Sequence, residues 1–215
     1  MTSDPHGNQP VREKGRPIKE AAGAAILVHG RGASASDILG LAEELYHPAL
    51  AYLVPEAAEH SWYPKSFLAP LEENEPWLSS ALKKLKDIVD YAVLSGIPLS
   101  RIALMGFSQG ACLTTEFVAR HPKRYGGLIA FTGGLIGPPG TRFQYAGKLD
   151  AMRALLASGD PDPYVPWQRV QDSAQVLSRM GADVTLRRYP GLPHTISQEE
   201  IVLAKPILMG LVPGA

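Results

Sequence analysis

The chain alternates short, almost continuously apolar runs with stretches that repeat at helical spacing. Residues 23–30, GAAILVHG, are the first such run, and residues 77–92 carry their apolar side chains on one helical face. Uninterrupted apolar runs are typical of strands buried on both faces of a parallel sheet. Strands that alternate with helices imply right-handed crossovers, so we predict an α/β fold: a mostly parallel sheet of six or seven strands with helices on both faces. The predicted strands are 23–30, 50–57, 101–107, 126–133, 151–159 and 183–191, and the predicted helices are 41–48, 77–92, 109–120, 166–180 and 197–210.

Composition excludes several classes of function. Lys and Arg together number 21, as do Asp and Glu, so the formal net charge is zero and nothing indicates a nucleic-acid partner. No apolar run approaches the roughly 18 residues of a membrane span, so we expect no stable membrane insertion. The single cysteine, Cys112, cannot form an intrachain disulfide, which fits a cytoplasmic location. The histidines are scattered and no set of residues has metal-ligand spacing, so no metal is expected.

The N-terminal stretch differs from the rest of the chain. Residues 1–18 are polar and rich in proline, and we predict a flexible tail or early edge structure there. They contain no apolar segment of the kind found in secretory signals, so no such signal is expected. No convincing linker interrupts the remainder, so residues 19–215 are predicted to form a single domain with a substantial core.

The segment GFSQG places Ser108 between two glycines, where a predicted strand gives way to a predicted helix. A strand–GxSxG–helix turn is the arrangement that presents a nucleophilic serine at the carboxyl edge of a sheet. Cβ atoms at Gly106 and Gly110 would collide with the adjoining elements, and the N–H of Gln109 at the helix start can stabilise an oxyanion. The competing interpretation is a tight turn that only needs small residues.

A serine nucleophile needs a base, and the base needs an acid that orients it. In this type of fold the acid and then the histidine follow the serine along the chain. Two histidines lie downstream: His121 ends a helix, whereas His194 lies in a Gly/Pro loop after the last predicted strand. The acid is predicted after the strand 151–159, where Asp160 and Asp162 are both available. We favour Asp162, which lies further into the loop, although either carboxylate can simply cap a turn.

An oxyanion hole needs a second N–H donor besides that of Gln109. The segment HGRGAS, residues 29–34, follows the first predicted strand, and its glycines allow close approach of the backbone. Arg31 is the candidate donor through its main chain, and His29 is assigned to the same loop. The alternative is an ordinary glycine-rich turn.

Residues 58–76 form a long loop with little periodicity, and long loops on compact domains are often functional. We predict that substrate contacts come from this loop and from the segment after residues 132–134, TGG, with ordinary core packing as the alternative. No lid domain is expected in a chain of this length, which predicts an open, shallow cleft and short or medium acyl chains. The candidate substrate-binding residues are Trp62, Tyr63, Phe67 and Leu135.

Several of these motifs resemble one known family in sequence and in order. They are LVHGRGAS (27–34), LVPEA (53–57), SRIALMGFSQGACLT (100–114), GDPDPYVP (159–166) and YPGLPHTIS (189–197). Together they are similar to the phospholipase/carboxylesterase family of α/β-hydrolases, which includes acyl-protein thioesterases.

The resemblance implies a Ser-Asp-His hydrolase that acts on esters or thioesters without a cofactor. It assigns Ser108 as nucleophile, Asp162 as acid and His194 as base, with Arg31 and Gln109 as oxyanion donors. It also implies a small-molecule ester as the partner and a homodimer as the assembly. Many family members have Leu where this chain has Arg31.

Other functions remain open at this point. Within the enzymes, a lysophospholipase, an acyl-protein thioesterase or a C–C bond hydrolase uses the same scaffold. A dienelactone-hydrolase-like enzyme is less favoured, because Ser108 stands where such enzymes usually carry cysteine. From a different class, the fold can serve as a non-catalytic binding module.

Overall fold

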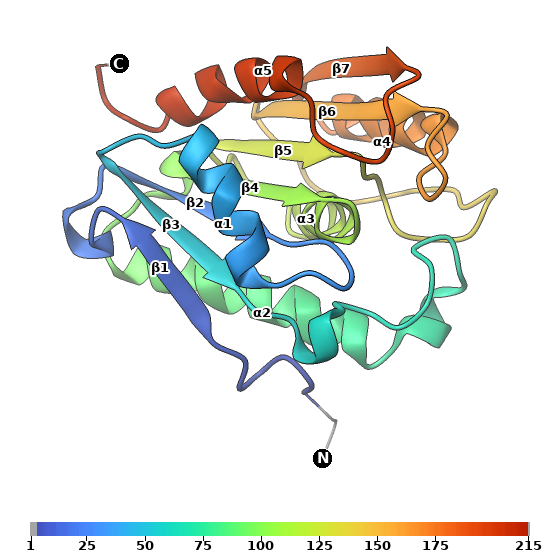
Figure 1. The fold of residues 1–215 in the computed structure, drawn as a ribbon, viewed down its shortest axis with the longest axis horizontal. Coiled ribbons are helices and arrows are strands. Elements are labelled where there is room, and N and C mark those ends of the chain that lie inside the picture. The colour runs from blue at the N-terminus through green and yellow to red at the C-terminus, as the bar shows by residue number, and fades with distance from the viewer. Residues whose placement is uncertain (1–3, 215) are drawn as a thin grey trace.

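A computed structural model describes residues 4–214 and contains one seven-stranded sheet in that part of the chain (Figure 1). The strand order is β1-β3-β2-β4-β5-β6-β7, and every neighbouring pair is parallel except β1 and β3. This confirms the predicted mostly parallel sheet. The strands are β1 Val11–Gly15, β2 Gly23–Val28, β3 Leu50–Pro55, β4 Ile102–Phe107, β5 Gly127–Phe131, β6 Arg153–Asp160 and β7 Asp183–Pro190.

Helices cover both faces of the sheet, as predicted. In Figure 1, α1 and α5 lie in front of the sheet, and α2, α3 and α4 lie behind it. The buried apolar residues accordingly form two clusters, one under α1 and α5 and the other under the three remaining helices. The helices are α1 Ala35–Glu44, α2 Trp77–Leu94, α3 Gln109–Arg120, α4 Trp167–Arg179 and α5 Gln198–Met209.

The central strands are apolar throughout because both of their faces are buried. Every residue of β2 is buried, and its side chains alternate between the two clusters: Ile26 packs under α2–α4, whereas Leu27 packs under α1 and α5. Such two-sided burial is expected only where helices cover both faces. The same property allowed the strands from β2 to β6 to be predicted from the sequence, whereas the edge strand β7 is only partly buried.

Helix α1 differs from its prediction. We expected a helix over residues 41–48, but it begins at Ala35 and ends at Glu44. A capping box fixes its start, since the Ser34 side chain accepts from the Asp37 N–H and the Asp37 side chain accepts from the Ser34 N–H. The expected stretch is therefore only the second half of the helix and the turn that follows it.

The N-terminal segment is edge structure, and the expectation of a flexible tail over residues 1–18 is wrong for the described residues 4–18. β1 pairs antiparallel with β3 at the edge of the sheet. His6 is fully buried: its ring lies 5.3 Å from that of Trp62 and 5.4 Å from that of Trp77, centroid to centroid. Its Nδ1 accepts from the Ala58 N–H, and its Nε2 donates to the Trp62 carbonyl.

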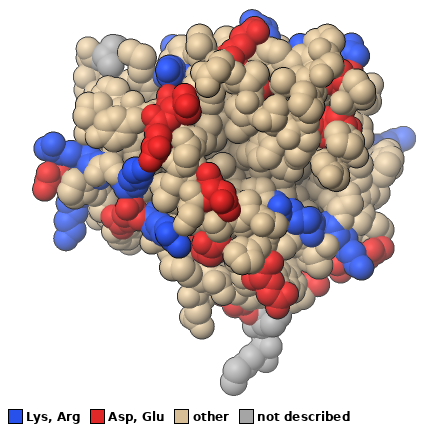
Figure 2. Space-filling view, in the orientation of Figure 1, with Lys and Arg blue, Asp and Glu red and all other residues tan. Residues whose placement is uncertain are grey.

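Surface features agree with the balanced composition. Figure 2 shows basic and acidic side chains interspersed over the face seen in Figure 1, without a large area of one sign. Within residues 4–214, no helix combines the length and the apolar character that crossing a membrane requires. Some connections in this part of the chain contain short 3₁₀ turns, for example at Ala58–His60 and Leu71–Asn74. Within the same residues, no lid domain is inserted between the strands and helices.

The two buried imidazoles predict a pH-dependent stability. Burial lowers the pKa of His6 and of His29, which lies near Glu56 and His60. The unfolded chain therefore takes up protons at higher pH than the folded chain does. The free energy of unfolding should thus fall as the pH falls below about 6.5, and these two groups should not change it above that pH.

Urea unfolding of wild type and His6→Gln between pH 5 and 8 checks this prediction. The variant removes one of the two imidazoles, so its stability should fall less steeply on acidification, even if it is lower at pH 8. Identical slopes for the two proteins below about pH 6.5 would contradict the assignment of His6 as a buried neutral group.

Candidate active site

Ser108 lies in a sharp turn between the end of β4 and the start of α3. Its φ of 54° and ψ of −118° are unusual for a residue with a Cβ and indicate a strained backbone. A Cβ at Gly106 would meet the main chain of Gly110, and a Cβ at Gly110 would meet the Val28 carbonyl of the neighbouring strand β2. Both glycines are therefore required by close backbone packing at this turn.

The three candidate residues Ser108, Asp162 and His194 lie together although they are far apart in sequence. His194 Nε2 is 2.9 Å from Ser108 Oγ, and His194 Nδ1 is 2.7 Å from Asp162 Oδ2. Ser108 follows β4, Asp162 follows β6, and His194 lies between β7 and α5. The parallel strands thus bring three loops to one edge of the sheet, as predicted.

The contacts of the two aspartates show which of them faces His194. The sequence favours Asp162 as the acid and leaves Asp160 as the alternative. The Asp162 side chain is fully buried, and its second oxygen, Oδ1, accepts from the main-chain N–H groups of Tyr164 and Val165, each at 2.9 Å. Asp160 instead forms an ion pair with Arg188 on β7. Asp162 is thus fixed in an orientation that faces the imidazole, and Asp160 is not available to it.

Two aromatic rings flank the His194 imidazole. The ring of Phe107 lies 4.9 Å from it at a tilt, and the ring of Tyr164 lies 4.9 Å away in an edge-on arrangement. Phe107 is the last residue of β4, directly before Ser108. Tyr164 was missed, although it follows the acid by two residues and is 66% exposed beside the site. Its position two residues after the predicted acid is the feature of the sequence that places Tyr164 near His194.

The turn Gly30–Gly32 lies directly against Ser108. A Cβ placed on Gly30 would be 3.5 Å from the Ser108 Cβ, an ordinary contact distance, so the turn and the serine lie in contact. Among the described residues, the main-chain N–H groups of Arg31 and Gln109 donate to no other group. His29 is buried behind this turn, where its Nδ1 donates to the Gly30 carbonyl and its Nε2 accepts from the Ala57 N–H.

The candidate substrate-binding residues are buried, and the expectation that their side chains line an open cleft is wrong in this structure. Trp62, Tyr63, Phe67 and Leu135 all belong to the core cluster under α2–α4, and none is more than 7% exposed. The Trp62 indole donates to the His29 carbonyl. The alternative of core packing therefore describes these four residues.

The other chemically notable residues have structural positions. Cys112 is buried in α3, and burial raises the pKa of its thiol to about 12, so the thiol is not ionised near neutral pH. His121 directly follows the end of α3, as predicted. Within residues 4–214, no three His, Cys, Asp or Glu side chains are placed so that they could hold a metal ion.

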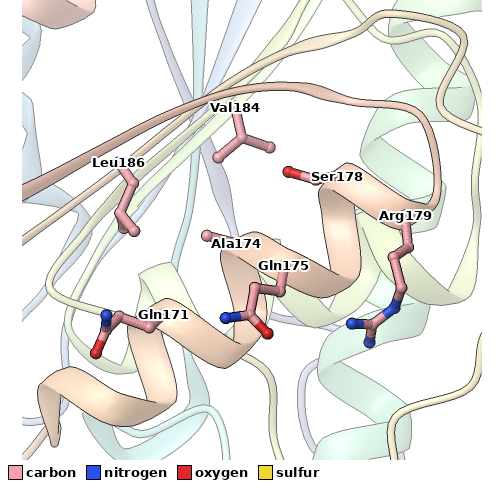
Figure 3. A pocket seen from close by; sticks show the side chains of 7 residues that line it. All are labelled: Gln171, Ala174, Gln175, Ser178, Arg179, Val184 and Leu186. Atoms are coloured by element: carbon pink, nitrogen blue, oxygen red, sulfur yellow. The ribbon is translucent and has the colours of Figure 1, made fainter.

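A surface hollow of about 390 Å³ lies between α4 and the edge strand β7, away from Ser108 (Figure 3). Its strand residues, Val184 and Leu186, come from the beginning of β7, whereas the loop that carries His194 follows the end of that strand. Figure 3 shows side chains of α4 along one side of the hollow and those of β7 along the other. The hollow is therefore separate from the candidate active site.

The sequence model of the phospholipase/carboxylesterase family matches residues 11–209 of this chain. The chain belongs to this family. A crystal structure of a phospholipase/carboxylesterase from Dyadobacter fermentans is 42% identical, with a TM-score of 0.90, and the match covers 94% of this chain and 97% of that one. The α/β-hydrolase architecture expected from the motifs is confirmed by this agreement.

Curated relatives are similar to this sequence over a shorter part of the chain. A probable carboxylesterase, SOBER1-like, from Arabidopsis thaliana is 30% identical over 129 residues, which is 60% of this chain and 49% of that protein. Acyl-protein thioesterase 1 from Gibberella zeae is 29% identical over 132 residues, which is 60% of this chain and 56% of that protein. The matched part thus spans about half the length of these relatives.

Proposed function

We propose that this protein is a serine carboxylesterase that hydrolyses short- to medium-chain carboxylic esters. The observation that carries the proposal is the continuous hydrogen-bonded series from Ser108 through His194 to Asp162, which begins at a strained turn beside two free N–H groups. Membership of the phospholipase/carboxylesterase family supports the same reaction type. We assign Ser108 as nucleophile, His194 as general base and Asp162 as the acid that orients it.

In the acylation half-reaction, Ser108 Oγ attacks the ester carbonyl carbon while His194 Nε2 takes the hydroxyl proton, across the 2.9 Å hydrogen bond. The Asp162 carboxylate accepts from Nδ1, which selects the tautomer with a free Nε2 and stabilises the imidazolium once it forms. The carbonyl electron pair moves to oxygen, and the N–H groups of Arg31 and Gln109 bind the resulting oxyanion.

The tetrahedral intermediate collapses when the imidazolium returns its proton to the alcohol oxygen, which leaves as the neutral alcohol. The acyl group then remains on Ser108 as an ester. Water repeats the sequence: His194 takes its proton, the hydroxyl adds to the acyl carbon, and the carboxylic acid leaves as Ser108 regains its hydrogen. No cofactor takes part in these steps.

The surroundings of the site favour small ester substrates. The aromatic residues of loop 58–76 are buried, and no lid domain covers Ser108 in the described chain. Tyr164 is the exposed aromatic side chain beside His194, and we propose that it contacts the substrate. It takes the place of the buried candidates Trp62, Tyr63, Phe67 and Leu135. The proposed partner is thus a small-molecule ester; the cytoplasmic location and the homodimer remain predictions from the sequence.

A lysophospholipase or an acyl-protein thioesterase is the main alternative, because one curated relative is named as such a thioesterase. A chain-length series on matched oxygen esters and thioesters separates these activities, since a thioesterase should prefer long thioesters. A non-catalytic binding module is disfavoured by the aligned hydrogen bonds of Ser108 and His194, which binding alone does not need.

Hydrolysis of p-nitrophenyl esters from acetate to palmitate, with wild type and Ser108→Ala compared, tests the proposal. We expect wild type to be fastest on the shorter esters, and Ser108→Ala to lose about 10⁴-fold or more of kcat because the nucleophile is gone. The variant should unfold at a temperature close to that of wild type. An inert wild type, or equal rates for the two proteins, would contradict the esterase function.

A further inference from the structure

We propose that the side chain of Arg31 is a positioning group that fixes both donors of the oxyanion hole. It does so by holding the loop segment 60–65 against the turn Gly30–Gly32 and the start of α3. The inference rests on the proposed esterase function, and it concerns a side chain at a position where only the main chain has been assigned a role.

The Arg31 guanidinium holds three groups of segment 60–65. Its Nη1 donates to Ser61 Oγ at 3.0 Å and to the Pro64 carbonyl at 2.9 Å, and its Nη2 donates to the Lys65 carbonyl at 2.5 Å. The guanidinium also lies 5.8 Å from the centre of the Tyr63 ring. Within residues 4–214 no carboxylate lies within ion-pair distance of it, so its contacts serve to hold the loop backbone.

The residue that carries the other donor binds the same segment. Gln109 Oε1 accepts from the Trp62 N–H at 2.9 Å, and its Nε2 donates to the Tyr63 carbonyl at 2.8 Å and to Ser61 Oγ at 3.3 Å. Ser61 Oγ therefore accepts from both Arg31 and Gln109, while it donates to the Tyr63 carbonyl at 2.9 Å. Both donor-bearing residues are thus joined through one hydroxyl group.

Two further hydrogen bonds, one from the main chain and one from a side chain, connect segment 60–65 to the turn. The Gly32 N–H donates to the His60 carbonyl at 2.7 Å, and the Trp62 indole donates to the His29 carbonyl at 2.9 Å. Segment 60–65 is therefore bonded to residues on both sides of Arg31 as well as to Arg31 itself. The segment, the turn and the start of α3 form one hydrogen-bonded unit.

This unit matters because an oxyanion hole accelerates a reaction only when its donors are already in place. Arg31 stands between Gly30 and Gly32, and glycine allows many backbone conformations, so the turn by itself holds the Arg31 N–H weakly. A planar guanidinium that bonds three fixed groups restricts that freedom. Lysine has the same charge but lacks the planar fork, so it cannot bond the same three groups together.

The test compares Arg31→Leu and Ser61→Ala with wild type on p-nitrophenyl butyrate and with an alkyl boronic acid, which forms a tetrahedral adduct with the serine. We expect kcat to fall about 10-fold or more in both variants, since a donor is misplaced rather than deleted. KM should change little, and the affinity for the boronic acid should fall by about the same factor as kcat.

Ser66→Ala is the matched control, because it removes a hydroxyl from the same loop. Among residues 4–214, this hydroxyl bonds only the Leu68 N–H and none of the groups described above. It should retain the wild-type kcat. Arg31→Lys should remain impaired, and a wild-type rate in that variant would overturn the proposal because charge alone would then suffice. Thermal unfolding of each variant identifies loss of the fold, and Ser61→Ala is the smaller change should Arg31→Leu fail to fold.

Failure of this inference and failure of the proposed function give different results. An inert wild type contradicts the esterase function itself. An active wild type, together with variants that keep kcat or that change only KM, contradicts the positioning role of Arg31 alone.

Discussion

The close approach of three backbone segments at Ser108 is the constraint on which the rest of the site depends. Gly110 packs against the Val28 carbonyl of β2, Gly106 packs against Gly110, and the Gly30 turn lies beside Ser108. A side chain at either of the first two positions would separate α3 from the sheet. The same packing that strains Ser108 therefore also sets the distance between its hydroxyl and the turn that carries the Arg31 N–H.

The parallel order of the strands supplies the remaining groups. β4, β6 and β7 all end at the same edge of the sheet, so the loops that follow them meet there without any special connection. Local hydrogen bonds then give each side chain its orientation, as when the Tyr164 and Val165 N–H groups fix Asp162. The strand order thus brings the three loops together, and short-range hydrogen bonds within the loops orient the side chains.

What the sequence predicts well and what it misses have different physical origins. The six parallel strands and the positions of Ser108, Asp162 and His194 follow from local patterns and from chain order, both of which are visible in sequence.

The burial of His6 depends on Trp62 and Trp77, more than fifty residues away, and no local pattern records that contact. The buried positions of Trp62 and Tyr63 are equally non-local, because both residues bond Gln109 at the start of α3 and Trp62 also bonds the His29 carbonyl after β2. The sequence predicts Arg31 only as a main-chain donor, since the folded loop alone shows which groups its guanidinium bonds.

Labelling with a fluorophosphonate tests the central claim, that Ser108 is an activated nucleophile, without any assumption about the natural substrate. Attack of the serine oxygen on phosphorus releases fluoride and leaves a stable ester that mass spectrometry can locate. We predict one equivalent of label per chain, on the peptide that contains Ser108, and much slower labelling in Asp162→Asn. No label, or a label elsewhere while Ser108 remains free, would contradict the account.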